Sequence, residues 1–184
     1  MNITDTQPAS AVMMTETPLK NDERLTGEAR WTALLAQWID GHPPALIQKW
    51  MVMYGLRHAL PEDDNARRLA TDILRWLDEP DDALRWAIFD QLETVGYESF
   101  VGGLGLSVFL SGSLTPEGQP AVYPPDGVVT EMLLSSARLL VVSDSPDGDF
   151  SQGVRRLLSE RPDGVAFRQD AIPGGKNNGY TTGL

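Results

Sequence analysis

The stretch GGLGLSVFLSGSLTPEGQPAVYPPDG, residues 102–127, decides how this chain folds, because an apolar glycine-rich run passes directly into a proline-rich one. Its first half belongs to an apolar pattern over residues 97–110 that predicts a helix. Gly102, Gly103 and Gly105 each cost such a helix about 1 kcal/mol relative to alanine. A second helix packed closely against the bare backbone would offset this cost. The sequence therefore predicts a central, buried helix here.

The second half of the stretch predicts a long connection without helix. A residue that precedes proline avoids helical backbone angles, so this part of the chain is expected to be extended. Loops of this length are uncommon in compact domains unless they are functional or packed by their own side chains. Two interpretations stay open: a structural crossover between distant helices, or a recognition surface made from proline and Tyr123. Asp126 is the candidate N-cap of the helix that follows.

Apolar residues at three- and four-residue steps predict helices on both sides of this stretch. A strand remains possible for the segment after the prolines, because its end is rich in β-branched residues, but its length favours a helix. The predicted fold is a single all-α helical bundle of about six to seven helices, with the proline-rich connection between the fifth and the sixth. The other predicted helices lie within residues 27–40, 44–60, 61–80, 79–96, 126–143 and 150–160.

The two ends of the chain lack this periodicity. The sequence predicts a disordered N-terminal arm over residues 1–25, a helical domain over 26–160 and a flexible C-terminal tail over 161–184. The first residues lack the basic and apolar regions of a signal peptide. No apolar run reaches the ~18 residues that a membrane-spanning helix needs. We therefore expect a cytoplasmic protein with no membrane span.

Charge and composition narrow the classes of partner and chemistry. The 184 residues carry a net charge of −11, which argues against nucleic acid as a partner because phosphate binding needs basic side chains. Acidic residues gather in residues 61–100, where eleven oppose four arginines. This excess either steers a basic partner or forms a solvated helix face. Its two densest clusters, residues 62–64 and 78–82, are expected to cap helices rather than to bind calcium.

No pattern in the chain predicts catalysis. The absence of cysteine excludes disulfides, thiolate zinc sites and cysteine nucleophiles. The two histidines, His42 and His58, are too far apart in sequence for a helical metal pair. The glycines lack the lysine of a phosphate-binding loop, and the Ser-Gly-Ser sequence at 111–113 lacks the surroundings of a nucleophile elbow. We predict no catalytic residue, no cofactor and no metal, and therefore no enzyme.

Five tryptophans are many for a chain of this length. Most lie on apolar stripes and are expected in the core, but Trp76 or Trp86 is expected to point outward and mark a binding site. The predicted contact surface combines such a tryptophan with the proline-rich connection and the acidic face of the third and fourth helices. Its residues are Pro116, Pro120, Tyr123, Pro124, Pro125, Trp76 and Trp86.

Residues 106–142, LSVFLSGSLTPEGQPAVYPPDGVVTEMLLSSARLLVV, resemble a segment of a family of uncharacterised small bacterial proteins. In that family an aromatic–Ser–Gly–Gly–Ser–x–Ala/Thr–Pro run leads through prolines into an apolar, alanine-rich helix. The present chain departs from the pattern through bulkier residues in that helix. The matching residues are Phe109, Ser111, Gly112, Ser113, Pro116, Pro124 and Pro125, and the bulkier ones are Met132, Leu133 and Leu134.

The resemblance covers about a fifth of the chain and implies an all-α domain. It also implies an accessory or adaptor role, since the family is often associated with type VI secretion gene clusters, and it implies no catalytic residues. We therefore predict a non-enzymatic protein-interaction module whose partner is a secretion-machine component or an effector. The alternative is a small-ligand-binding protein or an enzyme with a pocket beside the glycine-rich helix. No pattern predicts the oligomeric state.

Overall fold

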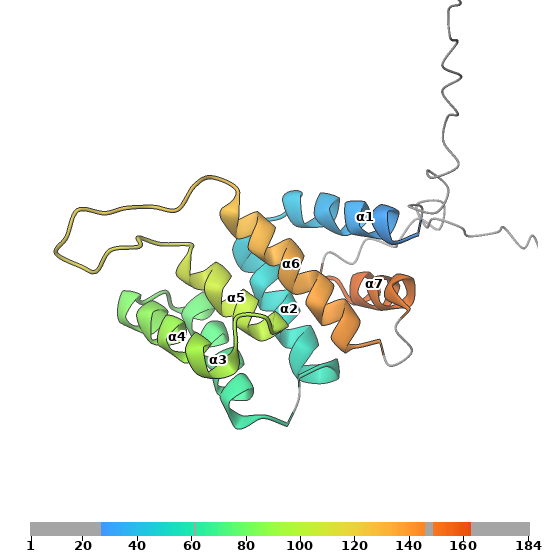
Figure 1. Cartoon of the computed structure of the whole chain (residues 1–184), viewed down its shortest axis with the longest axis horizontal. Coiled ribbons are helices and arrows are strands. Elements are labelled where there is room, and N and C mark those ends of the chain that lie inside the picture. The colour runs from blue at the N-terminus through green and yellow to red at the C-terminus, as the bar shows by residue number, and fades with distance from the viewer. Residues whose placement is uncertain (1–26, 61, 146–148, 163–184) are drawn as a thin grey trace, which may run out of the picture.

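The computed structural model describes residues 27–60, 62–145 and 149–162, and over these residues the chain forms seven α-helices and no strand (Figure 1). The prediction of an all-α bundle is confirmed. The predicted N-terminal arm lies outside the described residues, and so does the predicted C-terminal tail except for residues 161 and 162. The helices are α1 (Glu28–Asp40), α2 (Pro44–His58), α3 (Asp64–Asp78), α4 (Asp82–Val95), α5 (Phe100–Phe109), α6 (Val128–Ser143) and α7 (Phe150–Ser159).

Aspartate side chains begin three of the helices. Asp63 accepts a hydrogen bond from the backbone N–H of Asn65 at 2.9 Å, and Asp81 accepts one from Leu84 at 2.7 Å. Asp149 caps α7 in the same way. Each carboxylate satisfies a backbone donor that the first helical turn leaves unpaired. The acidic clusters before α3 and α4 thus cap helices, as their positions predict.

The prediction that Asp126 caps α6 is wrong. Gly127 is the N-cap residue, with φ at +84° and no side-chain hydrogen bond to the helix. The chain enters α6 through a left-handed turn that glycine adopts at no steric cost. Asp126 therefore stays exposed beside the start of α6.

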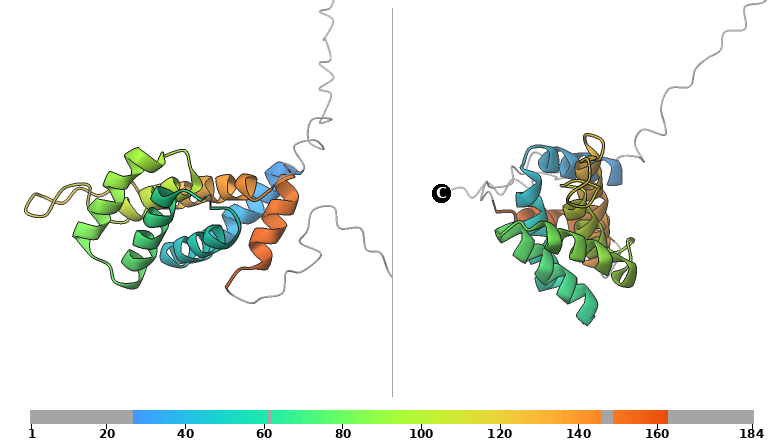
Figure 2. Two further views of the ribbon diagram at one scale, coloured as in Figure 1. Left: turned by 90° about the horizontal axis from the view of Figure 1, so that it is seen from below. Right: turned by 90° about the vertical axis from the view of Figure 1, so that its left-hand side faces the viewer.

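Helix α5 lies at the centre of the bundle and contacts α2, α3, α4 and α6 (Figures 1 and 2). A Cβ atom added at Gly103 would lie 2.4 Å from Oγ of Ser136 on α6. One added at Gly105 would lie 2.8 Å from a methyl group of Leu92 on α4. The two glycines let α5 approach α6 and α4 at distances that a side chain would forbid. The prediction of a central, buried helix is confirmed.

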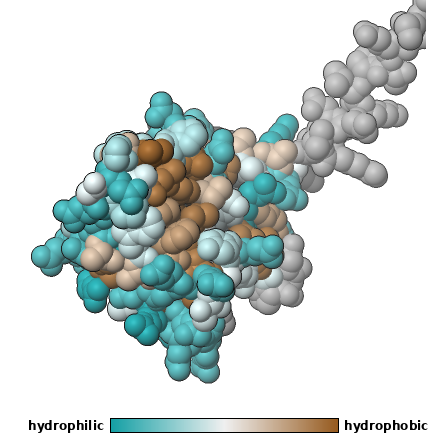
Figure 3. Space-filling view, turned by 60° about the vertical axis from the view of Figure 1, so that its left-hand side comes forward, coloured by the Kyte–Doolittle hydropathy of each residue, from teal (hydrophilic) through white to brown (hydrophobic). Residues whose placement is uncertain are grey.

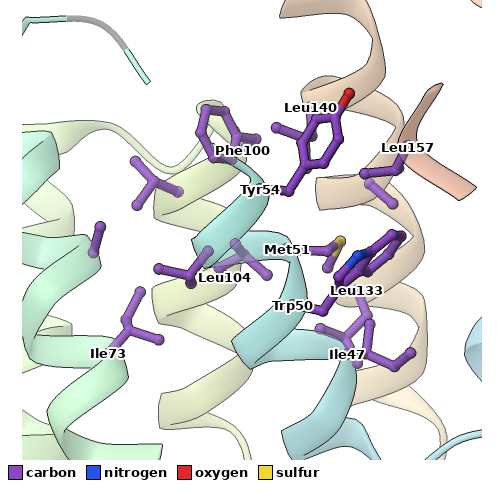
Figure 4. Close-up of a cluster of buried hydrophobic side chains, with 14 of the residues drawn as sticks. Ile47, Trp50, Met51, Tyr54, Ile73, Phe100, Leu104, Leu133, Leu140 and Leu157 are labelled. Atoms are coloured by element: carbon purple, nitrogen blue, oxygen red, sulfur yellow. The ribbon is translucent and has the colours of Figure 1, made fainter. Parts of the chain in front are cut away.

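The core that surrounds α5 is mostly apolar (Figure 4), and a polar pair from α2 and α5 lies within it. Gln48 of α2 donates a hydrogen bond of 3.0 Å to Ser107 of α5, and both side chains are buried. The Ser107 hydroxyl in turn donates to the backbone carbonyl of Leu104 at 2.7 Å. Because each buried group finds a partner, the pair fixes α2 against α5 without leaving unpaired polar atoms there.

Helix α7 packs against α1 and α6 through Val154, Leu157 and Leu158. A polar cluster also fixes the position of α7. Asp144 accepts a hydrogen bond of 2.6 Å from Tyr54 and forms an ion pair of 3.2 Å with Arg156. Burial, followed by the hydrogen bond to Asp144, raises the pKa of Tyr54 above its ordinary value. The phenol is therefore neutral and serves as the donor. None of the helices described here is long and apolar enough to cross a membrane.

Candidate interaction surface

Residues 113–127 form an arm that leaves the helical body at the end of α5 and returns at the start of α6. Figures 1 and 2 show it extending from one end of the molecule, beyond the ends of the surrounding helices. The arm contains one leucine, one alanine, one valine and one tyrosine together with four prolines. Proline lacks a backbone donor and holds φ near −65°, which keeps this part of the chain out of the helices on either side.

Hydrogen bonds between its two limbs give the arm a defined shape. The backbone N–H of Leu114 donates to the carbonyl of Val122 at 2.7 Å. Thr115 links the limbs a second time, because its hydroxyl donates to the carbonyl of Pro120 at 2.8 Å and accepts from the N–H of Val122 at 3.3 Å. Gly118 turns the chain at the tip with φ at +89°. The arm is thus an ordered, hairpin-like projection.

Arg85 anchors the base of the arm to the first turn of α4. Its buried guanidinium donates to the carbonyl of Phe109 at 2.6 Å and to the carbonyl of Ser113 at 2.8 Å, and it pairs with Asp82 at 2.7 Å. A Cβ atom at Gly112 would lie 2.7 Å from Nε of Arg85, which explains the glycine between Ser111 and Ser113. Sequence reasoning missed Arg85. The sequence feature that could have indicated Arg85 is a charged residue on the apolar face of α4, three residues before Ile88.

An aromatic cluster surrounds this anchor. The rings of Phe89 and Phe109 stack with centroids 4.1 Å apart, and Trp86 meets Phe109 edge-on at 4.9 Å. The Arg85 guanidinium lies over the Phe109 ring at 5.0 Å and over Trp86 at 5.6 Å. Cation–π contacts of this kind, in a partly desolvated site, stabilise the positive charge of Arg85, which the carbonyls of Phe109 and Ser113 also bind.

The expectation of an outward-pointing tryptophan is wrong for both candidates. Trp86 is half-buried in the aromatic cluster, where its Nε1 has no hydrogen-bond acceptor. Trp76 is half-buried against the core from α3. Packing against neighbouring rings and apolar side chains removes the surface that either indole would otherwise expose. Trp86 therefore lies near the arm's base beside Arg85 and Phe109, whereas Trp76 packs against the core from α3.

On the arm itself the exposed aromatic group is Tyr123. Its side chain is 69% exposed, and that of Val122 is 52% exposed. The prolines at 116, 120 and 125 are exposed and Pro124 is partly so. Figure 3, which brings the arm's side of the molecule forward, shows an apolar area across that face with hydrophilic residues around it. The proline and tyrosine residues of the predicted contact surface are thus together on the arm.

The arm and the turn before α4 carry acidic side chains. No lysine or arginine occurs between Arg85 and Arg138, while the arm itself carries Glu117 and Asp126. Asp81 and Asp82 lie at the start of α4, where Arg85 reaches the arm's base. The part of the surface that projects farthest therefore combines exposed apolar groups with negative charge.

A family model described as "Family of unknown function (DUF6931)" matches residues 23–160. The chain belongs to this family. The match spans all seven helices and the arm, so the DUF6931 domain is the helical body described above together with its projection. No curated protein and no solved structure matched the chain.

Several hollows on the described part of the DUF6931 domain lie away from the arm, and two of them bear on function. One, of about 300 Å³, is called the α2 groove, and another, of about 200 Å³, lies at the start of α5. Within the described part of the chain, no group of three or more metal-ligating side chains gathers. The α2 groove is lined by Leu46, Lys49, Trp50, Met53, Arg57, Glu160 and Pro162. Residues at the second hollow include Asp63, Glu98, Ser99, Phe100 and Val101.

Proposed function

We propose that this DUF6931 chain is a non-enzymatic protein-interaction module that binds a protein partner through the arm. The observation that carries the proposal is an ordered projection, tied down by Arg85, whose Tyr123 remains 69% exposed. A segment that keeps its shape when free loses little conformational entropy on binding. Tyrosine and proline together are typical of recognition segments, because both bury apolar area with few rotatable bonds.

The charge around the arm indicates what kind of surface the partner presents. Glu117 and Asp126 lie on the arm, and the acidic turn before α4 lies at its base. A basic partner surface would be attracted over distances of about 10 Å at ordinary ionic strength. The same charge disfavours nucleic acid, whose phosphates would be repelled. The partner we propose is therefore a protein with a basic rim around an apolar site.

The proposal extends to an accessory or adaptor role in a bacterial secretion system of the type VI kind. Its support is the resemblance of residues 106–142 to small bacterial proteins associated with such gene clusters. The structure adds a physical reason for two of the residues that carry that resemblance: Gly112 makes room for Arg85, and the Ser113 hydroxyl accepts a hydrogen bond of 3.1 Å from the backbone N–H of Thr115. On this proposal the chain works in the cytoplasm on a secretion component or an effector.

A photo-crosslinking amino acid at position 123 of the full chain, expressed in the source bacterium, tests the proposal. The matched control places the same group at Tyr97, which is also exposed and lies just before α5. We expect one secretion-cluster protein to crosslink at position 123 and not at position 97. The same protein should bind the wild-type chain, without a crosslinking group, and should not bind the Tyr123→Ala chain. A secretion-cluster partner that still binds the Tyr123→Ala chain would contradict the role of the arm. Crosslinks only to proteins outside such clusters would contradict the secretion role.

The hollow at the start of α5 supports a second candidate function, the binding of a small ligand. It lies beside the glycine-rich helix and combines the wall formed by Phe100 and Val101 with the carboxylates of Asp63 and Glu98. An apolar wall with two carboxylates suits a small cationic molecule. A thermal-shift screen of organic amines and divalent ions would detect it as a concentration-dependent rise in melting temperature that Glu98→Gln reduces. A screen without such a rise would remove this candidate.

A further inference from the structure

The arm has the properties of a ligand as well as those of a surface. Its most exposed part is the pair Val122–Tyr123, which has Pro120 before it and Pro124 after it. Its only charges are the carboxylates of Glu117 and Asp126. The site that accepts such a segment needs an apolar floor, room for one aromatic ring, and positive charge at the rim.

The α2 groove has these three properties. Its floor is Leu46, Trp50 and Met53, and Leu46 and Met53 remain 39% and 43% exposed on the surface of α2. A hollow of about 300 Å³ is at the small end of ligand pockets and suits one or two side chains rather than a cofactor. Lys49 and Arg57 stand at its rim.

The two basic side chains of the groove can exchange their present carboxylate partners for the carboxylates of a docked segment. Lys49 pairs with Asp78 and Arg57 pairs with Glu160, and about half of each basic side chain is exposed to solvent. Exposed ion pairs of this kind contribute about 0–1 kcal/mol, so replacing one carboxylate by another costs little. Glu160, the acidic group in the groove, retains His58 as a partner at 2.9 Å when Arg57 turns away.

The arm and the groove cannot meet within one molecule. The arm extends from one end of the helical body, and α7, whose C-terminal end lines the groove, packs at the other end (Figures 1 and 2). We infer that the arm of one copy docks into the α2 groove of a second copy, with Tyr123 against Trp50 and Met53. This contact joins two different surfaces, so it leaves a free arm and a free groove at the ends of every open assembly.

Such an interface is small, because only the exposed pair Val122–Tyr123 on the returning limb of the arm enters the groove. Interfaces below about 1,200 Å² are those of weak or transient complexes. The net charge of −11 on each copy opposes association further. We expect dissociation constants on the order of 100 µM, which require concentrated protein to be observed. The inference shares the arm with the proposed function but names a different partner.

Sedimentation velocity of the full chain between about 10 µM and 1 mM tests the inference, a range that brackets a weak complex. The arm variant is Tyr123→Asp and the groove variant is Met53→Glu, and both residues are exposed enough to change without loss of the core. We expect the wild type to form larger species as concentration rises, and each variant alone to stay monomeric. An equimolar mixture of the two variants should form a 1:1 dimer and nothing larger, because one intact arm meets one intact groove.

Tyr97→Asp is the matched control, since it places the same charge on another exposed tyrosine and should associate like the wild type. A wild type that stays monomeric at 1 mM, a single variant that associates as the wild type does, or a mixture that stays monomeric would each overturn the inference. Circular dichroism of every variant confirms that the helices are intact. A monomeric wild type leaves the proposed function standing, because that function requires a partner of a different kind.

Discussion

Replacing Gly103 by alanine tests the close approach of α5 and α6 directly. The added methyl group would lie 2.4 Å from Oγ of Ser136, which is buried and donates a hydrogen bond of 2.8 Å to the carbonyl of Met132. The serine cannot rotate away freely, because a buried hydroxyl without an acceptor costs about 1–3 kcal/mol. Moving α6 instead disturbs a packed core at a similar cost.

The magnitude follows from two opposed effects. Alanine stabilises a helix interior by about 1 kcal/mol relative to glycine. Overpacking costs about 1–3 kcal/mol, and a separation as short as 2.4 Å places this substitution in the upper half of that range, about 2–3 kcal/mol, which works against the gain. We expect Gly103→Ala to lower the free energy of unfolding by about 1–2 kcal/mol. In a urea titration followed by circular dichroism at 222 nm, the midpoint should fall by about 0.5–1.5 M.

Ser136→Ala supplies the matched background. It removes the one atom that obstructs the new methyl group and leaves the Ser136 Cβ position 3.5 Å away, an ordinary contact. In this background Gly103→Ala should be neutral, or stabilising by up to about 1 kcal/mol, which gives a coupling energy of about 1–3 kcal/mol between the two positions. A Gly103→Ala midpoint at or above the wild-type value, or an equal loss in both backgrounds, would refute the reasoning.

Three further predictions concern the arm's anchor, a helix cap and a buried phenol. Gly112→Ala should displace the Arg85 guanidinium and raise the exchange rate of the Leu114 amide at least about tenfold, as measured by hydrogen exchange, since about 1.4 kcal/mol of local stability changes a rate tenfold. Asp81→Ala should cost about 0.5–2 kcal/mol of stability in urea unfolding, whereas Asp90→Ala, an exposed residue inside the same helix, should cost less. Because the pKa of Tyr54 is raised in the folded state, its contribution to stability is fully present below pH 10 and is lost as pH rises further. Tyr54 should therefore ionise at a higher pH than an unperturbed tyrosine in an absorbance titration near 295 nm, and its ionisation at the ordinary pH would contradict the buried hydrogen bond to Asp144.

The helices and their beginnings were open to prediction because their causes are local. Apolar residues at three- and four-residue steps predict a buried face wherever the fold places it. Asp63 and Asp81 cap helices through backbone groups two or three residues away, so the short sequences around them suffice. Local sequence was not sufficient at Asp126, because the neighbouring Gly127 adopts a left-handed conformation and begins α6 without a side-chain cap.

The arm could be predicted in part. Prolines exclude helix over residues 116–125 regardless of the rest of the fold, but they did not indicate that this segment projects from the body. The exposure of Tyr123 and the burial of Trp86 depend on which neighbours arrive from elsewhere in the chain. An indole on a partly apolar helix face can pack or protrude, and periodicity alone does not distinguish the two.

By itself the sequence determined that this protein is helical, that the acidic clusters before α3 and α4 cap helices, and which segment cannot be helical, since backbone angles and capping depend on a few adjacent residues. Only the tertiary structure decided that Arg85 holds the carbonyl of Ser113, 28 positions away, and that Glu160 at the end of α7 meets Trp50 of α2, 110 positions away. Such contacts join groups whose separation along the chain carries no signal. Their geometry depends on how closely the helices approach, and glycines and buried polar pairs set that approach once all the elements are packed together.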